Sequence, residues 1–202
     1  MSKETEIFIA KNAKDVILSV RGTGFFPSLK MAQLIIESSG KDEQGKFKIG
    51  RGLAVRKANN YFGIKADKRW KGKRIALNTP RDGKPVNYFR VYPTALDSLK
   101  DHTQFLLHNS RYKTNGVFTA RTPQEQAEAL QRAGYSESPR YSKALIALIK
   151  AYNLEQLDGK KVSGSNVMTA NKSNTPNYLL IGGTILLTVG AAVYFNKRPA
   201  SS

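Results

Sequence analysis

The chain has 202 residues, and its 33 lysines and arginines against 15 acidic residues give a formal net charge of +18. This length is enough for one domain with a sizeable core and an additional segment. Because the chain contains no cysteine, disulfide bonds and thiolate chemistry are excluded. The excess of positive charge indicates a polyanionic partner: a nucleic acid, an anionic membrane, or a cell wall that carries carboxylates and phosphates.

The positive charge is not accompanied by a nucleic-acid-binding motif. The sequence has no helix-turn-helix, zinc-finger or RNA-stacking signature, and its lysines are scattered rather than gathered in a stripe. We therefore expect no nucleic-acid partner. The two histidines, His102 and His108, are too few for most metal sites, so we expect no metal and no cofactor. His102 is predicted to be a neutral packing residue on a helix face.

The first predicted element is an amphipathic helix over residues 4–20, which Arg21-Gly-Thr-Gly24 ends. Apolar residues recur in it at helical spacing, with lysines between them. They are Ile7, Phe8, Ala10, Ala13, Val16, Ile17 and Val20. We expect this helix to serve as scaffold.

A second helix is predicted from Pro27 to about Gly40. Proline is tolerated in a first helical turn, and the side chain of Ser28 is expected to cap the helix. Apolar residues cover most of the helix circumference, which indicates a buried helix. These residues are Leu29, Met31, Ala32, Leu34, Ile35 and Ile36.

One carboxyl group lies at the end of this apolar helix. Glu37 is the only acid between Asp15 and Asp42, and Gln33 lies one turn earlier on the same face. A carboxyl held by an apolar helix loses hydration, so its pKa is expected to rise. A general acid that works near neutral pH requires such a pKa. The alternative is a glutamate at a helix end that points into water.

The segment over residues 41–65 begins polar and glycine-rich and ends in Asn-Asn-Tyr-Phe-Gly-Ile-Lys. Phe62 can anchor a tight turn that Gly63 permits. The side chains of Asn59 and Asn60 offer amide donors and acceptors to a ligand. The alternative is a turn that ends a helix and binds no ligand.

A β-hairpin is predicted within the otherwise helical chain. Residues 74–79 and 85–92 have the composition of two short strands, and the Asp82-Gly pair between them is a hairpin-turn signal. Trp70, the only tryptophan, lies just before the first strand. Its ring is suited either to stacking on a ligand or to filling the base of the hairpin.

Helical spacing returns over residues 93–109, with Thr94 as the expected cap and Asp97 in the first turn. Residues 111–121 are predicted to form a loop. Thr122 then begins another helix with a capping signal.

This helix is expected to end near Arg132, and a last one covers residues 142–149. Tyr135 and Tyr141 lie in the connection between the two. Each tyrosine either contacts a ligand or packs the helix hairpin.

The composition changes after the predicted domain over residues 1–157. Residues 158–176 are rich in Ser, Asn, Gly and Lys without periodicity, which indicates a flexible linker. Residues 177–195 carry no charge, have a tyrosine near each end, and would span about 28 Å as a helix. They predict a transmembrane helix rather than a buried core helix, and residues 196–202 form a short basic tail.

Four segments resemble the motifs of one enzyme family. They are Pro-Ser-Leu-x-x-Ala-Gln-x-x-x-Glu-Ser at 27–38, Asn-Asn-x-Phe-Gly-Ile-Lys at 59–65, Phe-Arg-Val-Tyr at 89–92, and Gly-Tyr through Tyr141 at 134–141. Over roughly residues 5–153 the chain resembles the flagellar-type peptidoglycan glucosaminidases, glycoside hydrolase family 73 of the lysozyme-like superfamily. In the last segment Ser-Glu-Ser stands where the family usually has Ala-Thr-Asp, so the chemistry of that turn differs.

The resemblance implies an α+β fold that is mainly α: a lysozyme-like helical domain with a small inserted β-hairpin lobe. The sequence adds the C-terminal transmembrane helix. The resemblance also implies that Glu37 is the general acid and that Asp82 is the nearest candidate for the family's second acid. An Asp-Gly turn explains Asp82 without catalysis as well. The residues expected to bind substrate are Gln33, Asn59, Asn60, Phe62, Trp70 and Tyr135.

The implied reaction is hydrolysis of the β-1,4 bond after N-acetylglucosamine in peptidoglycan. Two carboxylates normally flank a glycosidic bond. If neither Asp82 nor Asp67 is the second one, the substrate's own acetamido oxygen is expected to act as nucleophile. The alternatives are a lytic transglycosylase or muramidase of the same fold, and a non-catalytic, membrane-tethered wall-binding module.

The expected partners are peptidoglycan glycan strands and, through residues 177–195, a lipid bilayer; the oligomeric state is left open. The chain is thus expected to be anchored in a membrane and to act on the cell wall. Its first six residues lack the basic and apolar regions of a signal peptide. Export is therefore expected to use a membrane-containing phage particle, a holin or a specialised apparatus. Basic residues flank both ends of the predicted span, so its orientation is not defined.

Overall fold

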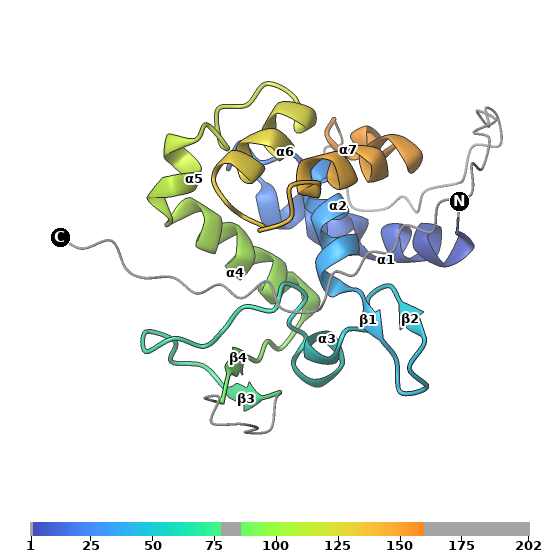
Figure 1. Cartoon of the computed structure of the whole chain (residues 1–202), viewed down its shortest axis with the longest axis vertical. Coiled ribbons are helices and arrows are strands. Elements are labelled where there is room, and N and C mark those ends of the chain that lie inside the picture. Colours follow the sequence, from blue (N-terminus) through green and yellow to red (C-terminus); the bar gives the residue numbers. More distant parts are fainter. Residues whose placement is uncertain (1, 78–85, 160–202) are drawn as a thin grey trace.

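The structure, a computed structural model, describes residues 2–77 and 86–159 (Figure 1). Its helices are α1 (Lys3–Val20), α2 (Pro27–Ser38), α3 (Leu53–Ala58), α4 (Ala95–Leu107), α5 (Ser110–Thr114), α6 (Pro123–Arg132), α7 (Tyr141–Ala151) and the 3-10 turn η1 (Leu154–Leu157). Its strands are β1 (Gly40–Lys41), β2 (Phe47–Lys48), β3 (Arg74–Ala76) and β4 (Tyr88–Arg90). Asp82, residues 160–176 of the predicted linker, the predicted transmembrane helix and the predicted basic tail lie outside the described residues. The predicted linker begins too early, because Asp158 contacts α2.

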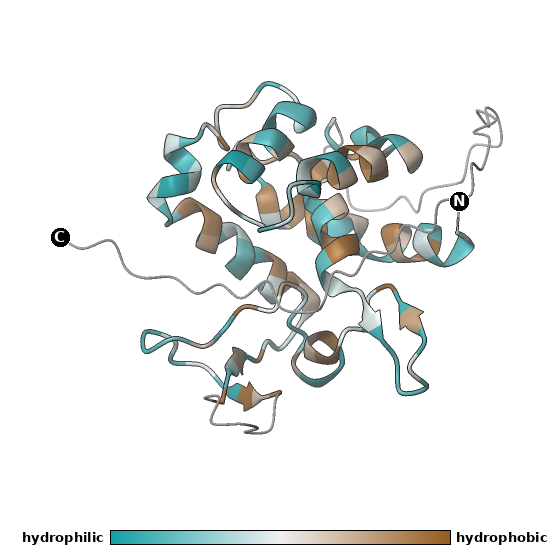
Figure 2. Ribbon diagram, viewed as in Figure 1, coloured by the Kyte–Doolittle hydropathy of each residue, from teal (hydrophilic) through white to brown (hydrophobic). Residues whose placement is uncertain are grey.

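Helix α2 is the central element, as its apolar circumference predicts. It packs against α1, α6, α7 and η1, and α1 also packs against α4 (Figure 1). Residues 28–35 are all buried. Figure 2 shows apolar residues of α2 and α7 between the helices, whereas α5 is mainly hydrophilic. The C-terminal end of α2 points toward the part of the molecule that contains α3 and both hairpins.

The start of α2 differs from the prediction. The N-cap residue is Phe26, which makes no side-chain capping bond, and the hydroxyl of Ser28 has no hydrogen-bond partner within the described part of the chain. Instead the carboxylate of Asp158 accepts a 2.7 Å hydrogen bond from the backbone N–H of Ser28. The helix is therefore capped by a residue 130 positions away, which a search for local capping residues does not find.

The polar segment after α2 forms a hairpin that the sequence analysis missed. Strands β1 and β2 are antiparallel, with Gly40 opposite Lys48. The Asp42 carboxylate accepts hydrogen bonds of 3.0 and 2.8 Å from the N–H groups of Gln44 and Lys46. This side chain closes the turn, which explains why strands of only two residues persist here.

The second hairpin confirms the predicted β-lobe. Strands β3 and β4 are antiparallel and pair Arg74 with Arg90 and Ala76 with Tyr88. In the described residues both strands are shorter than the predicted ranges, and the turn between them is not described.

The last helices largely follow the predictions. Thr94 and Asp97 form a reciprocal capping box at the start of α4, and Thr122 caps α6 by accepting from the N–H of Glu125. The predicted loop over residues 111–121 is partly wrong, because α5 covers its beginning. This single-turn helix is held by the buried ring of Tyr112 rather than by a periodic apolar face.

Within residues 2–77 and 86–159, no helix has the length and apolarity needed to span a membrane. The predicted transmembrane segment, residues 177–195, is not among them.

Candidate active site

Glu37 lies in the last turn of α2 and is partly buried. Its Oε1 accepts a 2.7 Å hydrogen bond from the hydroxyl of Tyr141. Burial raises the pKa of the Glu37 carboxyl to about 7, and the hydrogen bond from Tyr141 limits that rise. Near neutral pH, a large fraction of the carboxyl is therefore protonated and able to donate a proton.

Gln33 lies behind this contact, one turn before Glu37 on α2. It is fully buried, and its Nε2 donates a 3.2 Å hydrogen bond to the hydroxyl of Tyr141. Since the Tyr141 oxygen accepts from Gln33, its own proton is free to bind Glu37. The structure thus gives Gln33 a role in orienting the phenol, and a direct contact with substrate stays a prediction.

Tyr135 and Tyr141 are stacked, with ring centroids 5.3 Å apart and an angle of 21° between the rings. Both side chains are buried. Burial and the charge of Glu37 raise the pKa of Tyr135 well above its usual value, whereas a hydrogen bond with Tyr141 lowers it in part. Both phenols therefore stay protonated, and the one that contacts Glu37 is Tyr141. The sequence analysis placed Tyr135 in the site and missed the role of Tyr141.

The predicted ligands Asn59 and Asn60 make backbone contacts at the base of the β-lobe. Asn59 ends α3 with a left-handed φ of 49°, and its Nδ2 donates to the carbonyl of Tyr92 at 3.1 Å. Asn60 is buried, accepts from the N–H of Ile64 at 3.0 Å, and donates to the carbonyl of Arg90 at 2.9 Å. These amides hold the lobe in place; their contact with substrate stays a prediction.

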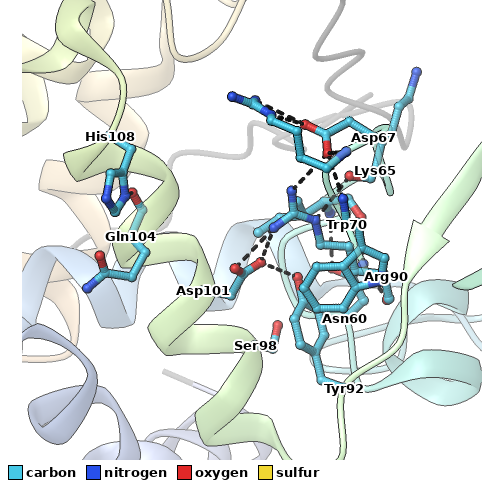
Figure 3. Close-up of polar contacts among 12 residues, drawn as sticks. Asn60, Lys65, Asp67, Trp70, Arg90, Tyr92, Ser98, Asp101, Gln104 and His108 are labelled. Atoms are coloured by element: carbon cyan, nitrogen blue, oxygen red, sulfur yellow. Dashed lines mark hydrogen bonds and ion pairs between the residues drawn. The ribbon is translucent and has the colours of Figure 1, made fainter. Parts of the chain in front are cut away.

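The two predicted aromatic ligands differ in exposure. Phe62 is buried and stacks on His102 with ring centroids 3.8 Å apart. Trp70 is partly exposed, and its Nε1 donates to the carbonyl of Lys73 at 3.0 Å. The guanidinium of Arg90 lies 4.7 Å from the Trp70 ring centre (Figure 3). Trp70 therefore supports the base of the lobe, and stacking on a sugar stays a prediction.

Arg90 joins the β-lobe to α4 (Figure 3). Its Nη1 donates to both carboxylate oxygens of Asp101, at 3.0 and 2.8 Å, and the hydroxyl of Tyr92 donates to Asp101 at 2.6 Å. Asp67 lies 3.1 Å from Arg69 and 3.9 Å from Arg90. Desolvation acts to raise the pKa of Asp67, but these cationic partners outweigh it and lower the pKa. Asp67 is thus ionised and paired with Arg69 and Arg90 in the β-lobe.

The structure also reveals a buried pair that the sequence analysis did not anticipate. Lys30 of α2 is fully buried, and its Nζ lies 2.6 Å from Nδ1 of His102. The other ring nitrogen, Nε2, lies 2.9 Å from the hydroxyl of Tyr135. His102 is a neutral buried residue, as predicted, but it is hydrogen-bonded at both nitrogens. A lysine inside an otherwise apolar helix was the available signal.

No cluster of three or more His, Asp or Glu side chains that could hold a metal ion occurs in the described segments. Asp82, the predicted second acid, lies outside them. The described site therefore consists of Glu37, its partner Tyr141, and the buried residues behind them. A helical body with a central acid-bearing helix and a small β-lobe defines the lysozyme-like class of domain.

Comparison with known proteins identifies the family within this class. The profile of the Glucosaminidase family, described as mannosyl-glycoprotein endo-beta-N-acetylglucosaminidase, matches residues 13–154. The chain belongs to this family, which confirms the resemblance seen in its motifs.

Curated relatives agree with this assignment. The peptidoglycan hydrolase FlgJ of Salmonella typhimurium is 31% identical over 179 residues, which cover 86% of this chain and 53% of FlgJ. The exo-glucosaminidase LytG of Bacillus subtilis is 30% identical over 172 residues, which cover 78% of this chain and 57% of LytG. The chain thus spans little more than half the length of these relatives.

Solved structures confirm the mainly helical, lysozyme-like α+β fold. The glycoside hydrolase domain of Salmonella typhimurium FlgJ superposes with a TM-score of 0.58 at 30% identity, covering 77% of this chain and 91% of that domain. The catalytic domain of the autolysin Auto from Listeria monocytogenes superposes with a TM-score of 0.63 at 25% identity, covering 78% and 89%.

Proposed function

We propose that this chain is a peptidoglycan hydrolase that cleaves the β-1,4 glycosidic bond after N-acetylglucosamine, with Glu37 as the general acid. The observation that carries the proposal is the Glu37 carboxyl, whose pKa is raised to about 7 and which accepts a hydrogen bond from Tyr141. Family membership and the names of the relatives FlgJ and LytG support the substrate and the bond.

In the proposed reaction, protonated Glu37 transfers its proton to the glycosidic oxygen as the bond between that oxygen and the sugar breaks. Glu37 is left as a carboxylate. The hydrogen bond from Tyr141, 2.7 Å long, stabilises this anion. Gln33 keeps the Tyr141 proton directed at Glu37 by donating to the phenol oxygen.

The second group in the reaction is Asp82 or the acetamido oxygen of the substrate. Asp82 is proposed because it lies in the sequence between β3 and β4, and the resemblance makes it the nearest candidate for the second acid. Asp67 is a weaker candidate, because its carboxylate is held by Arg69 and Arg90. Gln33, Asn59, Asn60, Phe62, Trp70 and Tyr135 are proposed to shape the sugar groove, directly or by supporting its walls.

We further propose that residues 177–195 anchor the enzyme in a bilayer, that residues 160–176 form the linker, and that residues 1–159 form the catalytic unit, to which the contact of Asp158 with Ser28 assigns the start of the predicted linker. This proposal is supported by the uncharged run of spanning length and by the change of composition that precedes it. The net charge of +18 favours binding to an anionic cell wall.

The test compares the wild-type chain with Glu37→Gln on purified peptidoglycan and identifies the released fragments by mass spectrometry. Glu37→Gln keeps the shape of the side chain but has no proton to transfer, so activity should fall by roughly a hundredfold or more. Glu128→Gln, an exposed position on α6, is the matched control and should retain activity. The wild type should release fragments with N-acetylglucosamine at the reducing end.

Other outcomes would select an alternative. Fragments that end in N-acetylmuramic acid would indicate a muramidase, and anhydro ends would indicate a lytic transglycosylase. A wild-type chain that binds walls without releasing fragments would be a wall-binding module. Near-normal activity of Glu37→Gln would refute the role of Glu37.

A further inference from the structure

Lys30 is an ionisable residue in the centre of the protein core. Its side chain is fully buried between α2 and α4, where Nζ donates to Oγ1 of Thr103 at 2.9 Å and lies 2.6 Å from Nδ1 of His102. The rings of Phe62 and Phe25 flank the amine, with centroids 4.8 and 5.8 Å away. A lysine is seldom fully buried, and an apolar residue of similar size would fill this space without a desolvation penalty.

His102 connects this amine to the tyrosines of the site. Its two nitrogens contact Lys30 and Tyr135, and its ring is held flat against Phe62 at 3.8 Å with an angle of 4°. Burial and the charge of Lys30 lower the pKa of His102 well below its usual value, so only one nitrogen carries a proton near neutral pH. The direction of the hydrogen bond with Lys30 therefore decides which ring nitrogen carries that proton.

A protonated amine can only donate, so it would place the ring proton on Nε2, whereas a neutral amine can either donate to Nδ1 or accept from it. Burial lowers the pKa of Lys30 and the charge of Asp101 opposes this, but even a neutral amine has two N–H groups. They suffice for Thr103 and for Nδ1 of His102. With Nδ1 accepting, the proton is on Nε2, which donates to the hydroxyl of Tyr135.

From Tyr135 the chain of contacts continues to the acid. Tyr135 stacks on Tyr141 and shares a hydrogen bond with it, and Tyr141 donates to Glu37. The donor that reaches the acid is Tyr141, and its ring is held by the stack on Tyr135. Three other ionisable groups lie near these residues. Asp101 acts on Lys30, whereas Arg111 and Tyr112 act on Tyr135.

We propose that Lys30 and His102 are positioning residues for the reaction: Lys30 donates to Nδ1 of His102, the Nε2–H of His102 then holds the hydroxyl of Tyr135, and the stack of Tyr135 on Tyr141 keeps the Tyr141 donor against Glu37. This inference rests on the proposed function, in which Glu37 is the general acid. Neither residue touches the reacting bond in this proposal. Their effect reaches Glu37 through the two phenols.

Two variants of the full chain test the inference by steady-state kinetics on a soluble peptidoglycan fragment. Lys30→Met removes the amine and keeps much of the volume, and His102→Phe keeps a ring against Phe62 without its nitrogens. Each should lower kcat about tenfold, the scale typical of lost orienting contacts, with little change in KM. The basic limb of the pH profile should move upward, because the bond from Tyr141 that lowers the pKa of Glu37 is weakened. The double variant should lose little more than either single one.

The matched control is Leu106→Ala, which removes a fully buried side chain from the same helix, α4. It should lower Tm but leave kcat and the pH profile unchanged well below Tm. If Lys30→Met and His102→Phe behave in the same way, their role is structural and the inference fails. His102→Gln, which can still donate to Tyr135, should recover part of the lost kcat.

A measurement on the unaltered chain keeps the inference testable if these variants do not fold. Nitrogen-15 NMR should show His102 as the neutral tautomer with the proton on Nε2. A proton on Nδ1, or on both nitrogens, would overturn the inference. Full activity of Glu37→Gln would refute the proposed function itself, whereas an inactive Glu37→Gln with fully active Lys30→Met and His102→Phe would refute only this inference.

Discussion

The hydroxyl of Tyr141 donates a 2.7 Å hydrogen bond to the carboxylate of Glu37, a residue 104 positions earlier in the chain. The bond joins the first residue of α7 to the last turn of α2. Two opposing effects act on Glu37 at this contact. Burial of the carboxyl raises its pKa, whereas the hydrogen bond from Tyr141 favours the ionised form and limits that rise.

Tyr141→Phe should therefore move the basic limb of the pH–activity profile to higher pH, because the pKa of Glu37 rises when the donor is lost. The expected displacement is about one to two pH units, since a hydrogen bond to a charged group is worth about 1.5–3 kcal/mol. The rate should also fall, because the Glu37 anion loses its donor. Tyr152→Phe, at the other end of α7, is the control, and an unchanged limb in Tyr141→Phe would contradict the assignment.

Glu37→Gln should stabilise the folded chain, and more so at higher pH. The pKa of Glu37 is about 7 when folded, against 4.5 for an unperturbed glutamate, so the folded state binds more protons between these values. The stability of the wild type should fall as the pH rises through that window. The difference from Glu37→Gln should reach at most about 3 kcal/mol at pH 8. Urea unfolding at pH 4.5 and 8 measures this difference in stability. The control Glu128→Gln should show no such dependence on pH. Equal stabilities of Glu37→Gln and wild type at pH 8 would refute the raised pKa.

Asp158→Ala should lower the free energy of unfolding by about 1 kcal/mol, because it removes the cap from Ser28 at the start of α2. Asp158→Asn retains an oxygen that can accept the same bond and is the matched variant. Chemical denaturation of the full chain gives both values. The two variants should differ; equal stabilities would show that the cap contributes nothing.

Asp82→Asn is expected to lower activity less than Glu37→Gln does, because the acetamido oxygen of the substrate can replace a second carboxylate. Rates on purified peptidoglycan compare the two variants directly. Asp67→Asn serves as a reference for an acid whose partners are Arg69 and Arg90. Equal losses for Asp82→Asn and Glu37→Gln would instead favour a mechanism with two carboxylates.

Removal of residues 177–202 should release the protein from membranes without loss of activity on isolated walls. The full chain should sediment with membranes and resist extraction by high salt, because a hydrophobic anchor is not screened as a charged contact is. Extraction of the full chain by salt would show an electrostatic association instead. Unfolding of the shortened chain would show that the segment belongs to the core.

The sequence by itself determined the elements whose signals are local. The all-round apolar pattern of α2, the lone acid Glu37 at its end, and the caps at Thr94 and Thr122 are each written within a few neighbouring residues. Periodicity and capping depend on contacts one helical turn apart. This is why the longer helices, the β-lobe and the family motifs could be predicted, whereas the short helices α3 and α5 were not.

Only the tertiary structure decided which residues contact Glu37 and the helix that carries it. Tyr141 reaches Glu37, Lys30 reaches His102, and Asp158 caps Ser28 across 104, 72 and 130 positions of sequence respectively. The first and third contacts exist because α7 and η1 pack against α2, and the second because the Lys30 side chain reaches α4. The packing also gives Glu37 its raised pKa, since desolvation depends on everything that surrounds the carboxyl and not on its neighbours in sequence.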